Sequence, residues 1–140
     1  PIAGNKITRL ISETLDLDLT QAEKAKIVCG LDSQKCHGAL KEILSDTIQE
    51  LSQEIIKAID FYYDNFPGHQ QIKKITLCGG GANLENIDSV INGYVKIPIV
   101  ISQPRKNLYR CPAFFTASNT QSYITAIGLA LRGLNQQNYL

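Results

Sequence analysis

Residues 72–90 read IKKITLCGGGANLENIDSV, and this stretch decides the fold class. The β-branched run Ile72–Cys78 is typical of a strand, and three glycines, Gly79–Gly81, follow it. Residues 82–95 then have the composition of a helix, and the apolar run Ile97–Ser102 is typical of a second, buried strand. Two strands joined by a helical crossover predict a parallel pair in an α/β fold.

The strongest periodic pattern precedes this stretch, between Cys36 and Phe66. Apolar residues recur there every three or four positions with Glu and Lys between them, and no Pro or Gly interrupts the run from Ala39 onward. Pro67 and Gly68 then end it. We predict one long amphipathic helix whose apolar stripe is a packing face. The stripe comprises Leu40, Leu44, Ile48, Leu51, Ile55, Ile59, Tyr62 and Phe66.

Two shorter helices are predicted before the long one. In the first, Asn5 is the expected N-cap, and apolar residues follow at helical spacing as far as Leu15. In the second, Thr20 and Glu23 fit the capping box S/T-x-x-E, and Gly30 fits the position just after a helix.

The chain after the second strand divides into a loop and a final helix. Residues 103–119 are rich in turn formers and lack periodicity, which favours a loop. Residues 120–134 predict a helix that is capped by Ser118 or Asn119 and ends at Gly133. Because a parallel sheet needs cover on both faces and usually more than two strands, we expect further strands to lie outside this chain.

The composition argues against several functions. The 140 residues are 44% hydrophobic and 19% charged, as in soluble globular domains, and the net charge is +1. That balance gives no electrostatic reason to expect nucleic acid or an anionic membrane surface as a partner. The longest apolar runs are too short to cross a bilayer, which needs about 20 residues. Methionine is absent, also from position 1, so we expect a piece of a longer protein.

The four cysteines, Cys29, Cys36, Cys78 and Cys111, are scattered and form no C-x-x-C pair. We therefore expect free thiols in a reducing cytoplasm and no disulfide. Cys36 stands beside His37, but adjacent side chains on a helix diverge and no second ligand pair follows, so no metal site is predicted. No pattern typical of a nucleophile with its base stands out either, and no catalytic residue is predicted.

The glycines Gly79–Gly81 are the first candidate for ligand binding. Glycine admits a positive φ and lets a flat or charged ligand approach the backbone without meeting a Cβ. A tight turn between a strand and a helix has the same needs, so both interpretations stay open. A Rossmann site is disfavoured, because Leu84 replaces the last glycine and Ser102–Gln103 replace the acid that binds ribose. A P-loop is excluded because no Gly-Lys-Ser/Thr follows.

The second candidate is the pair Glu23 and Lys26, which share one helix face at a spacing of three residues. The carboxylate can accept hydrogen bonds from ribose hydroxyls, and the Lys stem can lie against a purine ring. In the alternative interpretation, Glu23 closes the capping box and Lys26 is a solvated charge. The residues alone favour that alternative.

Taken in chain order, four segments resemble one family. Residues 1–11, PIAGNKITRLI, resemble the PxGGxxIT segment of FtsA- and PilM-type proteins, and residues 21–31, QAEKAKIVCGL, resemble their AExxKxxxGL helix. Residues 75–87, ITLCGGGANLENI, resemble the adenosine motif, and residues 124–134, ITAIGLALRGL, are similar to the closing helix of PilM proteins. The chain thus resembles the PilM family of type IV pilus assembly proteins from Pro1 to about Leu134.

The resemblance implies an α/β fragment of an actin-like domain, which binds ATP in a cleft between two lobes. Residues 1–35 would be the small helical subdomain of the second lobe, and residues 36–140 would be its long helix and the later part of its core. The phosphate loops and the carboxylates that position Mg²⁺ would precede Pro1. The implied nucleotide contacts are Glu23 and Lys26 on the ribose and base, and Gly79, Gly80, Gly81 and Asn83 along the adenine.

The resemblance also implies a cytoplasmic scaffold, peripheral to the inner membrane, whose ATP hydrolysis is at most slow. Its first lobe, which precedes this chain, would bind the tail of a PilN-type membrane protein; other pilus platform proteins and self-association are further expected contacts. An FtsA-like division protein and a nucleotide-free interaction module of the same fold remain alternatives. The chain departs from the family pattern at Ala3, where a Gly is usual, and at Glu85–Asn86, which replace Pro-Gly.

Overall fold

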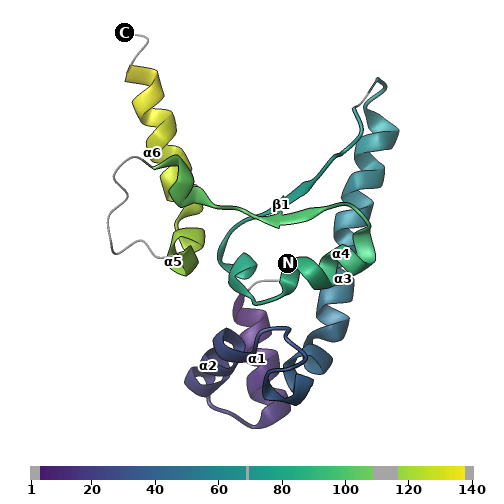
Figure 1. Cartoon of the computed structure of the whole chain (residues 1–140), viewed down its shortest axis with the longest axis vertical. Coiled ribbons are helices and arrows are strands. Elements are labelled where there is room, and N and C mark those ends of the chain that lie inside the picture. Colours follow the sequence, from purple (N-terminus) through teal and green to yellow (C-terminus); the bar gives the residue numbers. More distant parts are fainter. Residues whose placement is uncertain (1–3, 69, 109–116, 138–140) are drawn as a thin grey trace.

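The computed structural model describes residues 4–68, 70–108 and 117–137, so the predictions on Ala3 and Cys111 lie outside the described residues. The described chain is mostly helical, with one sheet of two strands. Helices α1 (Gly4–Leu15) and α2 (Leu19–Cys29) pack together at one end of the molecule (Figure 1), and the long helix α3 (Ala39–Asn65) extends from them past the sheet.

The N-cap of helix α2 lies two residues earlier than the sequence predicts. Asp18 is the N-cap: its Oδ1 accepts hydrogen bonds from the backbone N–H groups of Thr20 and Gln21 at 2.7 and 2.8 Å. The Gln21 side chain accepts from the Asp18 N–H at 3.2 Å, which completes the box. The predicted Thr20–Glu23 box is therefore wrong, because the Asp18 carboxylate holds the N–H groups of the first turn. Glu23 has no capping role.

Helix α1 also begins earlier than predicted. It starts at Gly4, so Asn5 lies inside the helix and is not its N-cap. The face that α1 turns inward carries Ile7, Thr8 and Ile11, all of them buried. Two of these side chains are apolar, whereas Thr8 brings a hydroxyl group to the buried face.

The long helix supplies the centre of the core. Leu44 and Ile48 of α3 are 0% and 1% exposed and pack with Ile11 of α1 and Ile91 of α4 (Ile87–Val95). Burying each such side chain contributes roughly 1.5–3 kcal/mol. The helix starts at Ala39, a few residues after its predicted start, because Cys36–Gly38 form a separate 3₁₀ turn. No helix in the described ranges has both the length and the apolar character needed to cross a membrane.

The sheet confirms the predicted parallel arrangement. Strand β1 (Ile75–Leu77) pairs with β2 (Ile99–Ile101), with Ile75 opposite Ile99 and Leu77 opposite Ile101, and α4 forms the crossover between them. The isoleucines and the leucine of the pairs point to the core, while Thr76 and Val100 are exposed on the other face. Both strands are shorter than the predicted runs. The backbone hydrogen bonds between them extend only from the Ile75 N–H, which donates to Pro98, to the Leu77 carbonyl, which accepts from Ser102.

The predicted final helix is two helices. Helix α5 (Ala117–Ser122) begins ahead of the predicted caps, Ser118 and Asn119, whose side chains lie outside the description. A turn at Tyr123, whose N–H donates to the carbonyl of Thr120 at 3.3 Å, separates it from α6 (Ile124–Gln137). Helix α6 continues through Gly133, where an end was predicted, since one glycine inside a helix costs only about 1 kcal/mol.

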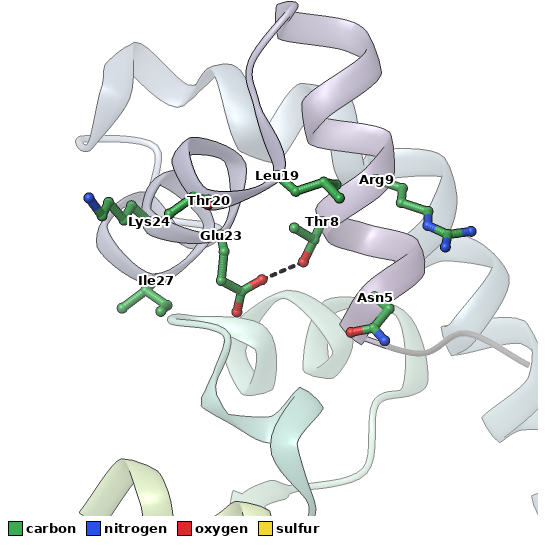
Figure 2. A pocket seen from close by; sticks show the side chains of 8 residues that line it. All are labelled: Asn5, Thr8, Arg9, Leu19, Thr20, Glu23, Lys24 and Ile27. Atoms are coloured by element: carbon green, nitrogen blue, oxygen red, sulfur yellow. Dashed lines mark hydrogen bonds between the residues drawn. The ribbon is translucent and has the colours of Figure 1, made fainter.

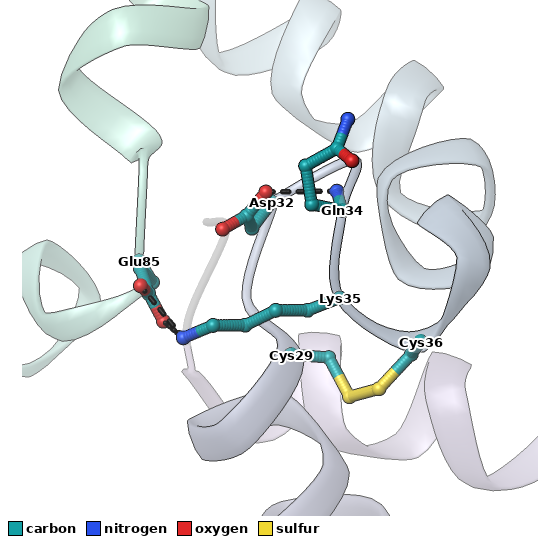
Figure 3. Close-up of a disulfide and its surroundings, with 6 residues drawn as sticks. All are labelled: Cys29, Asp32, Gln34, Lys35, Cys36 and Glu85. Carbon is teal, nitrogen blue, oxygen red and sulfur yellow. Dashed lines mark hydrogen bonds and ion pairs between the residues drawn. A yellow bond between two sulfur atoms is a disulfide. The ribbon is translucent and has the colours of Figure 1, made fainter.

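Cys29 and Cys36 form a disulfide (Figure 3), so the prediction of free thiols is wrong for this pair. Cys29 ends α2, and residues 30–35 turn back through a hydrogen bond from the Gln34 N–H to Asp32 Oδ1 at 2.8 Å. This turn brings the two Cα atoms to 5.8 Å, within the range for a disulfide. Sequence spacing alone did not indicate that turn. Cys78 is a free, exposed thiol.

Candidate functional site

Five of the six predicted nucleotide contacts line a single cavity of about 550 Å³. Glu23 and Lys26 come from α2, and the glycines and Asn83 come from the 3₁₀ turn η2 (Gly80–Asn83). Residues of α1, Ile27 of α2, Leu84 and Ser122 of α5 complete the lining. Gly79, the sixth predicted contact, is the N-cap of η2 and does not line the cavity. Segments more than fifty residues apart in sequence thus meet at one site.

The α2 wall of the cavity is a network of side chains. Lys26 Nζ donates to Glu23 Oε2 at 2.6 Å, to Thr8 Oγ1 at 2.9 Å and to the Gly4 carbonyl at 3.4 Å. The Lys26 side chain is 17% exposed and that of Glu23 is 45% exposed, so neither is a fully solvated surface charge. The interpretation of Lys26 as a solvated charge is therefore wrong.

The charge of Glu23 is stabilised by its neighbours. Burial raises the pKa of the Glu23 carboxyl, but hydrogen bonds from Lys26 and Thr8 and the positive charge of Lys26 outweigh that effect. The pKa of Glu23 consequently lies below its ordinary value of 4.5. All hydrogen bonds that Glu23 accepts within the described residues reach Oε2, which leaves Oε1 for a ligand.

The glycine wall is built from the backbone of Gly80 and Gly81, and Gly79, which precedes them, has a different role. Gly79 has a φ of +90°, a conformation that side chains rarely adopt. Gly80 and Gly81 have no such φ. A Cβ added to Gly80 would lie 3.7 Å from Ser122 Oγ, and a Cβ added to Gly81 would meet no atom within 4 Å. Gly79 is thus needed for the turn, whereas Gly80 and Gly81 leave space open at the cavity.

The helix predicted to follow the glycines directly begins later. Asn86 adopts a left-handed conformation, with φ of 63°, between η2 and α4. The N-terminus of α4 at Ile87 is therefore separated from the glycines by residues 82–86, and its free N–H groups are not the ones at the cavity. The glycine wall therefore exposes to a ligand backbone atoms that no side chain covers.

Glu85, which the sequence marked only as a departure from the family pattern, joins the two walls. Its carboxylate accepts from Lys35 Nζ at 2.6 and 2.8 Å (Figure 3), and its carbonyl accepts from the Leu31 N–H at 2.9 Å. A Cβ on Gly30 would lie 2.5 Å from that of Glu85, so only glycine permits this approach. The loop after α2 is therefore fixed against the residue that follows η2.

Two further cavities adjoin the site. One, of about 590 Å³, lies between α1 and α2 and shares Glu23 with it; Figure 2 shows the Glu23 carboxylate directed at Thr8 there. The other, of about 510 Å³, follows the end of β2 and shares Asn83. Within the described residues, no group of three or more His, Cys, Asp or Glu side chains could hold a metal ion.

Comparison with known proteins identifies the family and the fold of the chain. The family model described as "Type IV pilus assembly protein PilM" matches residues 1–134. No curated protein matches the chain. A chain of the solved structure "PilM-PilN type IV pilus biogenesis complex" is similar with a TM-score of 0.70 and 24% sequence identity. The similarity covers 94% of this chain but 37% of the matched chain, so the chain spans little more than a third of that relative.

Proposed function

The chain belongs to the family of the type IV pilus assembly protein PilM, and from that premise we propose that it forms the adenosine side of an ATP pocket. The protein that contains it would be an actin-like scaffold for type IV pilus assembly. The observation that carries this proposal is the convergence of Glu23, Lys26 and the glycine turn on one cavity. The predicted fold, a fragment of an actin-like α/β domain, is confirmed by the structural similarity.

The cavity suits an adenosine group in size and chemistry. Its volume of about 550 Å³ lies within the usual range for small-molecule sites, roughly 300–1,000 Å³. Oε1 of Glu23 can accept a hydrogen bond from a ribose hydroxyl. The purine ring would lie along Gly80 and Gly81, where no Cβ projects, and against apolar lining side chains. These apolar residues are Ile7, Ile27 and Leu84.

The phosphates and Mg²⁺ would be held by the part of the protein outside this chain. The described residues include no carboxylate cluster suited to a metal, and the chain covers 37% of the matched relative. Charge-assisted hydrogen bonds to phosphates usually carry much of the affinity for a nucleotide. We therefore propose that this chain selects adenosine, while the remaining part supplies the phosphate loops and any slow hydrolysis.

The solved relative is a complex of PilM with PilN, which supports a proposal for the partner. The tail of a PilN-type membrane protein would bind the first lobe, outside this chain, and would keep the scaffold in the cytoplasm at the inner membrane. Contacts with other platform proteins, or between copies, are compatible with this arrangement. The FtsA-like alternative is disfavoured because the PilM family model matches residues 1–134.

Titration calorimetry with Mg·ATP tests the proposal. We expect the longer protein to bind ATP, and the isolated chain, checked for folding by circular dichroism, to bind it weakly or not at all. Absence of binding to the folded longer protein would contradict the proposal and favour a nucleotide-free interaction module of the same fold. Micromolar affinity of the isolated chain would contradict the division of labour between adenosine and phosphate contacts.

A further inference from the structure

We propose that Thr8 is a positioning residue of this pocket, an inference that rests on the proposed nucleotide function. Thr8 belongs to α1, is 7% exposed, and contacts both charged residues of α2. Its hydroxyl donates to Glu23 Oε2 and accepts from Lys26 Nζ at 2.9 Å. A single neutral side chain from a neighbouring helix therefore holds both members of the pair.

The hydroxyl fixes an orientation that the pair alone would not keep. Glu23 and Lys26 lie three residues apart on α2, and because the Glu23 side chain is 45% exposed, the ion pair alone would not hold its carboxylate in one rotamer. The bond from Thr8 fixes Oε2 of Glu23 on the side of α1, so the free Oε1 is the oxygen available to a ligand. Lys26 is drawn to the same side, where its ammonium also reaches the Gly4 carbonyl at 3.4 Å.

The single proton of the Thr8 hydroxyl has two possible acceptors, one that positions Glu23 and one within helix α1. A threonine hydroxyl has one proton, which it gives either to Glu23 or to the carbonyl of Gly4, 3.0 Å away and four residues back. The bond to Gly4 would satisfy the hydroxyl within α1 with no help from α2. The bond accepted from Lys26 stands in both cases, since it uses a lone pair. The positioning role requires the proton to point at Glu23; a proton given to Gly4 would leave Thr8 connected to α2 through Lys26 alone.

Volume alone does not explain a threonine here. Its neighbours on the inner face of α1, Ile7 and Ile11, are apolar and buried. Valine has nearly the same shape as threonine and would fill the site without a polar atom to satisfy. Valine lacks only the hydroxyl, and in Thr8 this hydroxyl contacts Glu23 and Lys26 of α2. The bond from Thr8 is also among the causes that lower the pKa of Glu23.

The test compares Thr8→Val and Thr8→Ser in the longer protein, by calorimetric titration with Mg·ATP and by thermal midpoint. We expect Thr8→Val to weaken ATP binding about five- to tenfold and Thr8→Ser to retain most of the affinity, because serine keeps the hydroxyl. The matched control is Thr47→Val, which removes a buried hydroxyl from α3, away from the cavity, and should leave the affinity unchanged.

A pH series gives a readout that a merely structural role would not move. Without the Thr8 bond the pKa of Glu23 rises, so ATP binding by Thr8→Val should decline at a higher pH than in the wild type as the solution is acidified. Wild-type protein that binds no ATP would contradict the proposed function itself. Wild-type binding with an unchanged affinity and pH profile in Thr8→Val, or equal losses in Thr8→Val and Thr8→Ser, would overturn the positioning role alone.

Discussion

The two walls of the cavity are built in opposite ways. The α2 wall consists of the paired side chains of Glu23 and Lys26, which Thr8 of α1 hydrogen-bonds without lining the cavity itself. The glycine wall consists of the backbone of Gly80 and Gly81, where no Cβ projects. Binding at the α2 wall should be weakened by substitutions that remove a polar group, and binding at the glycine wall by substitutions that add a side chain. Substitutions of the two kinds therefore distinguish the walls.

The largest effect on binding is expected at the glycine wall. Gly80→Val in the longer protein should abolish measurable ATP binding and leave the protein folded, because a branched side chain would occupy the space of the base. Gly93→Val is the control, since Gly93 lies on α4 and a Cβ added there would meet no atom within 4 Å. Calorimetry and thermal midpoints measure both. If Gly80→Val unfolds the protein, the glycines serve only the backbone turn.

The next effect concerns the disulfide that ties the end of α2 to the 3₁₀ turn before α3. Reducing the Cys29–Cys36 bond should lower stability by roughly 2–3 kcal/mol, as expected for release of a short loop. Thermal unfolding with and without reductant measures it, with Cys29→Ser as the matched variant that should no longer respond. Equal midpoints in both conditions for the wild type would mean that the two thiols are unpaired in solution.

In the turn formed by Gly79–Gly81, the first and the last glycine should respond differently to the same change. Gly79→Ala forces an L side chain to a φ of +90° and should cost roughly 1–2 kcal/mol of unfolding free energy. Gly81→Ala, where the added Cβ meets open space, should cost much less. Denaturant unfolding of the two variants checks this prediction, and equal losses would contradict the division of roles among the glycines.

The smallest effect is expected at Glu23. Glu23→Gln replaces a charged acceptor with a neutral one and should weaken ATP binding by about 1 kcal/mol, roughly fivefold. Since the pKa of Glu23 lies below 4.5, the carboxylate contributes to stability above that pH and this contribution is lost as the pH falls further. Gln21→Ala is the control: it removes the Gln21 side-chain bond of the capping box and should lower the midpoint slightly without changing affinity. Unchanged affinity in Glu23→Gln would exclude the ribose contact.

The spacing of apolar residues along the sequence was enough to predict the long helix and the two strands. The long helix was predictable because apolar residues at every third or fourth position place Leu44 and Ile48 on one face of a helix, where they are buried. The parallel strands followed from two apolar runs flanking a helical segment. The pairing of Glu23 with Lys26 was predictable from helical spacing, and the family resemblance indicated that the glycine turn would face them.

Contacts between distant segments were not predictable in the same way. The docking of Gly30 on Glu85, fifty-five residues apart, and the hydroxyl of Thr8 between α1 and α2 depend on how helices are placed, and a single sequence carries no direct signal of that placement. The disulfide depends on a turn formed by Asp32 and Gln34. The capping box was misplaced because Asp18 and Thr20 both fit the N-cap pattern, and the stronger acceptor holds the position.

The most direct test of one pocket with two walls is hydrogen exchange of the longer protein, measured by mass spectrometry with and without Mg·ATP. If both walls contact the nucleotide, ATP should slow exchange in peptides covering α2, residues 19–29, and in peptides covering the glycine turn, residues 79–84, at the same ATP concentration. Slower exchange in only one of the two segments, or in neither while ATP is bound, would contradict the account.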